Sequence, residues 1–350
     1  VVSRAKEVVK DMYGSILSIY YYYASASSDL DVYSIGPNEF NMLCVECDLA
    51  VPGSTDCAKQ HLEQIFISVD AGQKTKEDFN KKHALSRQEF LQCVVRIAIH
   101  RYVKPRKRGE APIHTDVADA IHELLKVHIE PRLDPAALQN SNDFRLQFVY
   151  TRETEEVLSD HYETLQNLYE VYSAKEHGME EVTADIKMLG IDEWLDLCAD
   201  LQLVDDEFTL REARLCFLWS RLRVADESNA AQRRAMCNLR FEDFIECMVR
   251  LATMKRVPTD QETQDGGYVD GGELVLELRK NHSFRAWCMA RPQAWNTPLS
   301  QPIHRCVHHL MAIIIRTVEE PLLVMDEESR GRLTKKEVRN FQKVARVKGE

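Results

Sequence analysis

The sequence contains little glycine and little proline. Of its 350 residues, 13 are glycine and 11 are proline, whereas glycine usually makes up about 7% of a globular protein. Glycine supplies the turn conformations that short hairpins need and lets a backbone approach a phosphate closely. Its scarcity therefore argues against a glycine-rich nucleotide-binding fold or a many-stranded β-sandwich, and it favours a chain built from helices.

The sequence also lacks an excess of positive charge and a long apolar run. Its 45 Lys and Arg residues against 56 Asp and Glu residues give a net charge of −11, so nucleic acid is not an expected partner. The longest apolar runs, such as Leu310 to Ile315, fall far short of the roughly 20 residues that span a bilayer. We therefore expect no membrane partner. The sequence begins at Val1 rather than Met, so a preceding targeting segment is left open.

Familiar catalytic motifs are missing as well. The sequence has no G-x-S-x-G nucleophile elbow, no P-loop and no G-x-G-x-x-G fingerprint. Cys44 and Cys47 form a C-x-x-C pair on a predicted helix, but without a second pair at metal-binding spacing we interpret them as core residues. The ten cysteines as a whole are expected to be reduced, buried thiols of an intracellular protein. We expect a non-enzymatic protein without a cofactor.

One predicted helix near the C-terminus carries several metal-binding residue types. His304 and His308 stand four positions apart on one helical face, and Cys306 and His309 lie close by. Two imidazoles at this spacing can share a metal, which is the basis of one functional hypothesis, a metal-dependent enzyme. No H-E-x-x-H motif supplies a general base, so we favour a solvated or interface helix.

An internal repeat organises the chain. Residues 35–49 align with residues 189–203, and residues 90–103 align with residues 244–257, both at an offset of 154. Residues 90–103 and 244–257 are identical at six positions. In the first of these blocks they are Phe90, Cys93, Val95, Arg96, Ala98 and Val103. Two separate blocks at one offset indicate a duplicated unit of helices, because the apolar spacing within them is helical.

The repeat predicts an all-α chain with five parts. These are a helix-pair unit at 1–104, a linker and bridging helix at 105–151, a second helix-pair unit at 152–258, an insertion or linker at 259–301, and C-terminal helices with a further loop at 302–350. The glycine-rich, acidic start of the insertion is typical of a linker.

The four loop exits of the repeated units share one pattern: an apolar residue, three residues, an acid and an aromatic. The four sets are Ile35/Glu39/Phe40, Leu85/Glu89/Phe90, Leu189/Glu193/Trp194 and Leu239/Asp243/Phe244. This pattern resembles the calmodulin-like EF-hand superfamily, in which an apolar residue at loop position 8 joins a small ribbon and an acid at position 12 closes a calcium site. The resemblance implies two tandem EF-hand-pair lobes over residues 3–104 and 152–258.

The metal-binding positions of these four loops depart from the family. Calcium needs oxygen ligands early in the loop, but most of these positions carry hydrocarbon or cationic side chains, such as Val182 and Lys82. We expect none of the four to bind calcium tightly and their acids to cap the following helices. The loop at 326–337 is best preserved, with Gly331 at position 6 but Arg330 at position 5. The remaining calcium candidates are Asp78, Asn80, Glu89, Asp326, Glu328 and Glu337.

Two segments are candidates for contact with partner proteins. Tyr20 to Tyr23 point around the whole circumference of the first predicted helix, so one lobe core is not expected to bury all four. Residues 100–108 are locally basic in an acidic chain and are suited to an acidic protein surface. The basic candidates are Lys104, Arg106, Lys107 and Arg108.

The leading interpretation is a non-enzymatic scaffold within a larger assembly. Duplicated lobes with emptied loops and the F-x-x-C-x-V-R-x-A signature are similar to EF-hand proteins of the ciliary and flagellar axoneme. That resemblance implies a microtubule-associated protein of the cytoplasm and cytoskeleton, with tubulin or axonemal proteins as partners. The alternative is a calcium sensor with one or two weak loops.

Overall fold

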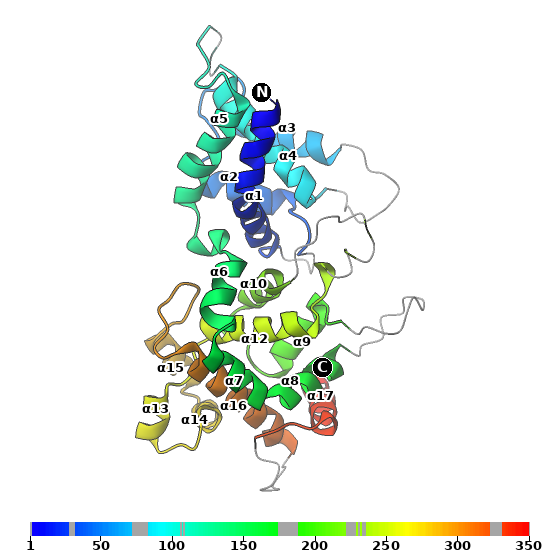
Figure 1. The fold of residues 1–350 in the computed structure, drawn as a ribbon, viewed down its shortest axis with the longest axis vertical. Coiled ribbons are helices and arrows are strands. Elements are labelled where there is room, and N and C mark those ends of the chain that lie inside the picture. The colour runs from blue at the N-terminus through cyan, green and yellow to red at the C-terminus, as the bar shows by residue number, and fades with distance from the viewer. Residues whose placement is uncertain are drawn as a thin grey trace. The chain divides into compact units, whose positions relative to one another are not determined.

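The computed structural model describes residues 2–27, 32–71, 83–105, 107, 109–173, 188–221, 229, 232, 236–322 and 331–349. Over these residues the chain is helical, with two isolated β-bridges and no strand. The all-α prediction is therefore confirmed. The chain divides into two compact units, Val1–Asn140 and Ser141–Glu350 (Figure 1).

Unit 1 is arranged around its first helix. Its elements are α1 (Val2–Ala24), α2 (Pro37–Glu46), α3 (Lys59–Asp70), α4 (Arg87–Ala98), η1 (Ile99–Val103), α5 (Val117–His122), η2 (Glu123–Ile129), η3 (Glu130–Arg132) and η4 (Pro135–Leu138). Helix α1 packs against α2, α4, α5 and η4, and α3 packs against α4. Because α1 has neighbours on several sides, it is buried throughout from Ile16 to Ala24.

Unit 2 contains the second copy of the repeat and the C-terminal helices. Its elements are α6 (Ser141–Phe144), η5 (Arg145–Val149), α7 (Arg152–Asp160), α8 (Tyr162–Tyr172), α9 (Ile191–Asp200), α10 (Leu210–Ser220), α12 (Phe241–Met254), α13 (Asp260–Gly266), α14 (Gly271–Lys280), α15 (Phe284–Ala290), α16 (Ile303–Leu322) and α17 (Lys335–Gly349). Helix α10 packs on α12, α14 packs on α16, and α17 packs on α8 and α16. The stretch predicted as an insertion or linker, 259–301, holds α13, α14 and α15.

The repeat in the sequence is also a repeat in the backbone. Ile35 and Leu85 form an antiparallel bridge with N···O distances of 3.0 and 2.8 Å. Leu189 and Leu239, each 154 residues later, form the same bridge with distances of 3.0 and 2.7 Å. Each bridge joins the loops that precede two helices of one unit, so it fixes where both helices begin.

Local capping explains why helices start at these loops. The Ser86 N–H donates to Glu89 Oε2 at 2.8 Å, and the Arg240 N–H donates to Asp243 Oδ2 at 3.1 Å. An acid three residues into a helix thereby satisfies one of the free N–H groups at the helix start. The Thr209 side chain caps α10 by accepting from the Arg211 N–H.

Each unit has its own apolar core. Leu17, Ile35 and Phe90 are buried in unit 1, and Trp194 and Phe244 are buried in unit 2. Most longer helices bury one side and leave a polar side exposed. None of the helices in the described parts of the chain is both long enough and apolar enough to cross a membrane.

Candidate functional site

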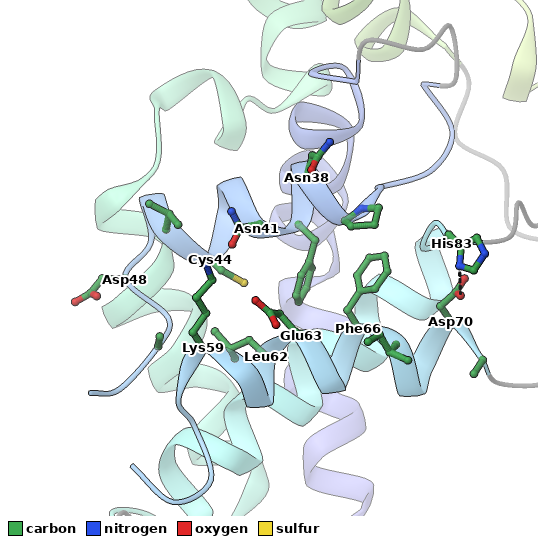
Figure 2. Close-up of a pocket in the computed structure, with 16 residues that line it drawn as sticks. Asn38, Asn41, Cys44, Asp48, Lys59, Leu62, Glu63, Phe66, Asp70 and His83 are labelled. Carbon is green, nitrogen blue, oxygen red and sulfur yellow. Dashed lines mark ion pairs between the residues drawn. The ribbon is translucent and has the colours of Figure 1, made fainter. Parts of the chain in front are cut away.

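An apolar groove of about 810 Å³ lies between α2 and α3 of unit 1 (Figure 2). The rings of Phe40 and Phe66 meet in its wall with centroids 5.3 Å apart. Leu62 and Cys44 complete the apolar lining near them. Figure 2 shows Cys44 on α2 facing Lys59, Glu63 and Phe66 on α3 across the groove.

The lips of the groove are apolar and exposed. Val45 on α2 is 67% exposed and Ile67 on α3 is 63% exposed. On α3 the residues that face the core, Leu62, Phe66 and Val69, follow helical spacing, and Ile67 lies outside that stripe. Exposed apolar side chains beside an apolar groove are typical of a protein–protein contact site.

The charges at the groove are mostly negative. Asp48 lies at one end, Asp70 and His83 lie at the other, and Glu63 lies between them (Figure 2). Asp70 Oδ2 is 3.9 Å from His83 Nδ1, an ion pair only when the imidazole is protonated. Lys59 is the other cationic residue of the lining. A ligand at this groove therefore meets an apolar wall with carboxylates at both ends.

Buried polar groups hold the turn at the end of α2. The Arg101 guanidinium donates to the carbonyl oxygens of Asp48 at 3.1 Å and Leu49 at 2.6 Å. His128 Nε2 lies 3.0 Å from the same Asp48 oxygen. Burial, and then the nearby Arg101 charge, lower the pKa of His128. A neutral imidazole and a buried cation thus fix this turn, so the groove is largely preformed.

The thiols of the C-x-x-C pair belong to the core. Burial raises the pKa of Cys44, Cys47 and Cys93 to about 12. None of the ten cysteines, all of which lie in the described ranges, forms a disulfide, and nine of them are buried. A thiol with so high a pKa is neutral at physiological pH and a poor nucleophile.

The histidine-rich helix is α16. His309 is buried, and its Nε2 lies 2.8 Å from Asp260 Oδ1, while the His308 ring faces His161 with centroids 5.7 Å apart. Arg305 also pairs with Asp260, and the Arg305 hydrogen bond is the largest cause that lowers the Asp260 pKa to about 2. Within the described ranges no group of three or more His, Cys, Asp or Glu residues is placed to hold a metal.

The four consecutive tyrosines are all buried. Tyr20, Tyr21, Tyr22 and Tyr23 are between 0% and 8% exposed. The Tyr20 hydroxyl donates to the carbonyl oxygen of Tyr33, and the Tyr23 hydroxyl donates to Glu46 Oε2. The structure therefore leaves no exposed tyrosine patch on this helix for a partner.

The basic stretch is described in part. Lys104 pairs with Asp56 at 3.3 Å and lies 3.1 Å from His100 Nε2. Lys107 is exposed. Arg106 and Arg108 lie outside the described residues.

The calcium candidates divide in the same way. Asp78, Asn80, Asp326 and Glu328 lie outside the described residues. Glu89 caps the start of α4, and Glu337 accepts from the N–H and the hydroxyl of Thr334 at 2.7 Å each. Both described carboxylates thus have a use in helix capping.

A smaller apolar cleft lies in unit 2. Tyr150, Leu158, Tyr162 and Ile245 line a space of about 420 Å³ beside η5 and α7. Leu146 on η5 and Tyr150 are well exposed. Neither this cleft nor the α2/α3 groove follows from the sequence patterns above. The sequence feature that points to the α2/α3 groove is an apolar residue outside the buried stripe of its helix, as Ile67 is in α3.

One protein family matches part of the chain. Residues 187–273, about a quarter of the sequence, match the family described as Ndufs5, NADH:ubiquinone oxidoreductase, NDUFS5-15kDa. The matched stretch holds α9, α10, α12, α13 and the start of α14. No curated protein and no solved structure matches the chain.

This match overturns several predictions from the sequence. The assignment to the EF-hand superfamily is wrong, and so are the axonemal scaffold, the calcium sensor and the cytoskeletal, ciliary or flagellar location, because the family that matches is described as NADH:ubiquinone oxidoreductase, NDUFS5-15kDa. Tubulin and axonemal proteins are wrong as partners, whereas membership of a larger protein assembly is supported. The physical reason is that an apolar residue, an acid and an aromatic at this spacing suffice for a bridge and a capped helix without any metal.

Proposed function

We propose that this chain is a non-catalytic accessory subunit of an NADH:ubiquinone oxidoreductase. The observation that carries the proposal is the family match over residues 187–273. The match covers residues 187–273 only, and we infer from it that the whole chain belongs to the same protein assembly. The proposed partners are the other protein subunits of that complex.

The structure supports the proposal by showing what the matched stretch does in unit 2. It supplies packed interior elements rather than a surface loop. Arg250 on α12 is fully buried, donates to Glu246 at 2.6 Å, and lies 4.0 Å from the centre of the Phe144 ring. Lys255 is buried against Asp205. Each buried charge is stable only with its partner in place, so these pairs favour one packing of the helices in unit 2.

We propose that the subunit has no catalytic role and no cofactor of its own. Nine of the ten thiols, all in the described residues, are buried, and burial raises the pKa of Cys288 and Cys306 to about 11. The buried histidine of α16 is engaged with Asp260. These groups act in packing and ion pairing, which is what an accessory subunit needs.

We also propose the helix arrangement expected from the sequence: two tandem lobes of the calmodulin kind with a C-terminal helical region. This concerns how the helices are arranged and does not imply membership of the EF-hand superfamily. What supports it is one bridge in each unit at the same offset, Ile35 to Leu85 and Leu189 to Leu239. The helices that follow each bridge begin with an acid in the first turn.

The proposal is tested by finding the chain in its native assembly. The chain is tagged in the cells from which it comes, the membranes are solubilised with a mild detergent, and the extract is separated on a native gel. We expect the tagged chain to migrate with the band that oxidises NADH and to co-purify with its subunits. A chain that migrates apart from that band, or co-purifies with a different complex, would overturn the proposal. An equally tagged matrix protein controls for adventitious retention.

A further inference from the structure

The α2/α3 groove of unit 1 has the dimensions of a helix-binding site. Helix α3 has 12 residues, which gives a wall about 18 Å long, the length of about three helical turns. The groove volume of about 810 Å³ is large enough for several apolar side chains. The Phe40 and Phe66 rings pack on each other in its floor, and the exposed side chains of Val45 and Ile67 offer the apolar contact area that helix anchors use.

The charges at the groove select among possible occupants. Asp48 at one end and Glu63 in the middle supply exposed carboxylates, Asp70 at the other end is buried beside His83, and Lys59 supplies a cation (Figure 2). An anionic lipid or a fatty acid would bring its own negative charge to this surface, and like charges disfavour it. A helix with an apolar stripe flanked by Lys and Arg complements both the apolar wall and the carboxylates.

We propose that the α2/α3 groove binds a basic amphipathic helix of a partner protein. Val45 and Ile67 contact the apolar stripe of that helix at the two lips, above a floor formed by Phe40 and Phe66. The exposed carboxylates of Asp48 and Glu63 pair with its cations. This inference rests on the proposed function only for the existence of protein partners, and it concerns unit 1, outside the matched stretch.

The test uses the purified full chain and fluorescein-labelled peptides of about 14 residues, long enough for nearly four turns. The first peptide is helical with Leu on one face and Lys on the other. The second has the same composition in scrambled order, and the third has Glu in place of Lys. A labelled fatty acid tests the lipid alternative. Binding is followed by fluorescence polarisation, at low and at high salt.

Two charge-matched variants locate the site. Ile67→Asp changes an exposed lip residue, so the fold should survive, and circular dichroism checks this. Val127→Asp changes a comparably exposed residue of η2, 54% exposed, away from the groove lining. Both add one negative charge, so non-specific attraction of a cationic peptide rises equally in the two.

We expect the Leu/Lys peptide to bind the parent chain, with weaker binding at high salt, and Ile67→Asp to weaken binding about tenfold or more. Val127→Asp should leave binding unchanged. Hydrogen exchange in the presence of the peptide should slow in α2 and α3. Equal binding of the scrambled or Glu peptide, binding of the fatty acid alone, or no effect of Ile67→Asp would each overturn the inference. Because the assay uses the isolated chain, its failure is separate from failure of the native-gel experiment.

Discussion

Helix α14 approaches α16 through Gly272, and an added methyl group there has no room. A Cβ at Gly272 would lie 2.3 Å from the carbonyl oxygen of Ala312, 2.7 Å from its carbonyl carbon and 2.6 Å from Arg316 Cγ. Carbon contacts are normally about 3.5–4.0 Å. Because the nearest obstacle is backbone, α14 must move away from α16 as a whole. Overpacking of this kind costs about 1–3 kcal/mol, and removing Gly from a helix returns at most about 1 kcal/mol.

We therefore expect Gly272→Ala to destabilise unit 2 by about 2 kcal/mol. The four tryptophans, Trp194, Trp219, Trp287 and Trp295, all belong to unit 2, so their fluorescence during urea unfolding reports on this unit. The midpoint should fall by roughly 1 M urea. The control is Gly14→Ala in α1, where a Cβ meets nothing within 4 Å, and it should leave the tryptophan transition unchanged. An unchanged or raised midpoint for Gly272→Ala would refute the reasoning.

Two further outcomes test the buried charges of α12. Arg250→Ala should destabilise unit 2 by about 3 kcal/mol, because it leaves Glu246 without one of its buried partners, whereas Arg96→Ala, at the exposed repeat position, should change stability by less than about 0.5 kcal/mol. Equal effects in urea unfolding would contradict this. Burial raises the pKa of Asp243 to about 6, above its unfolded value of about 4, so the folded chain binds this proton more tightly and the contribution of Asp243 to stability falls as the pH rises between those values. Between pH 4 and pH 7 the Asp243 carboxyl lowers the free energy of unfolding of the parent by about 2–3 kcal/mol, and Asp243→Asn should abolish this part of the pH dependence. If urea unfolding shows the same change between pH 4 and pH 7 in parent and variant, the explanation is wrong.

The repeat and the helix starts could be predicted because both depend on local chemistry. The bridge residues Ile35 and Leu85, and their counterparts Leu189 and Leu239, stand at the apolar positions of the repeated pattern. An acid three residues into the helix caps it whatever the rest of the chain does. Low glycine content likewise acts through local backbone preference, and it correctly favoured helices.

The groove could not be predicted because exposure depends on which elements pack together. Val45 and Ile67 look like core residues in a list of apolar positions, yet they lie on the open sides of α2 and α3. The reverse holds at Tyr20–Tyr23, where a helix surrounded by α2, α4, α5 and η4 buries residues on every side. The spacing of apolar residues predicts a helix, but it does not predict how many other helices pack against it.

The Gly271–Gly272 pair shows the same limit at a finer scale. Two adjacent glycines in an acidic stretch are typical of a linker, which is why residues 259–301 are expected to be an insertion or linker. In the structure they begin α14 and lie against α16, where a Cβ on Gly271 would meet the His309 ring at 2.6 Å. Glycine serves here for close helix approach rather than for flexibility. Only the partner helix, distant in sequence, distinguishes the two uses.

The wrong assignment to the EF-hand superfamily has a physical origin that also explains the fold. In a calcium-binding loop the acid at the last position is a bidentate ligand of the metal. Here Glu89 caps α4 through the Ser86 N–H, and the Glu39 carboxylate lies so close to Gly36 that a Cβ there would be 2.6 Å from Oε2. The bridge between Ile35 and Leu85 joins the two loops directly. The same residue pattern is therefore fully used by capping and bridging, and it is evidence for paired helices rather than for a bound ion.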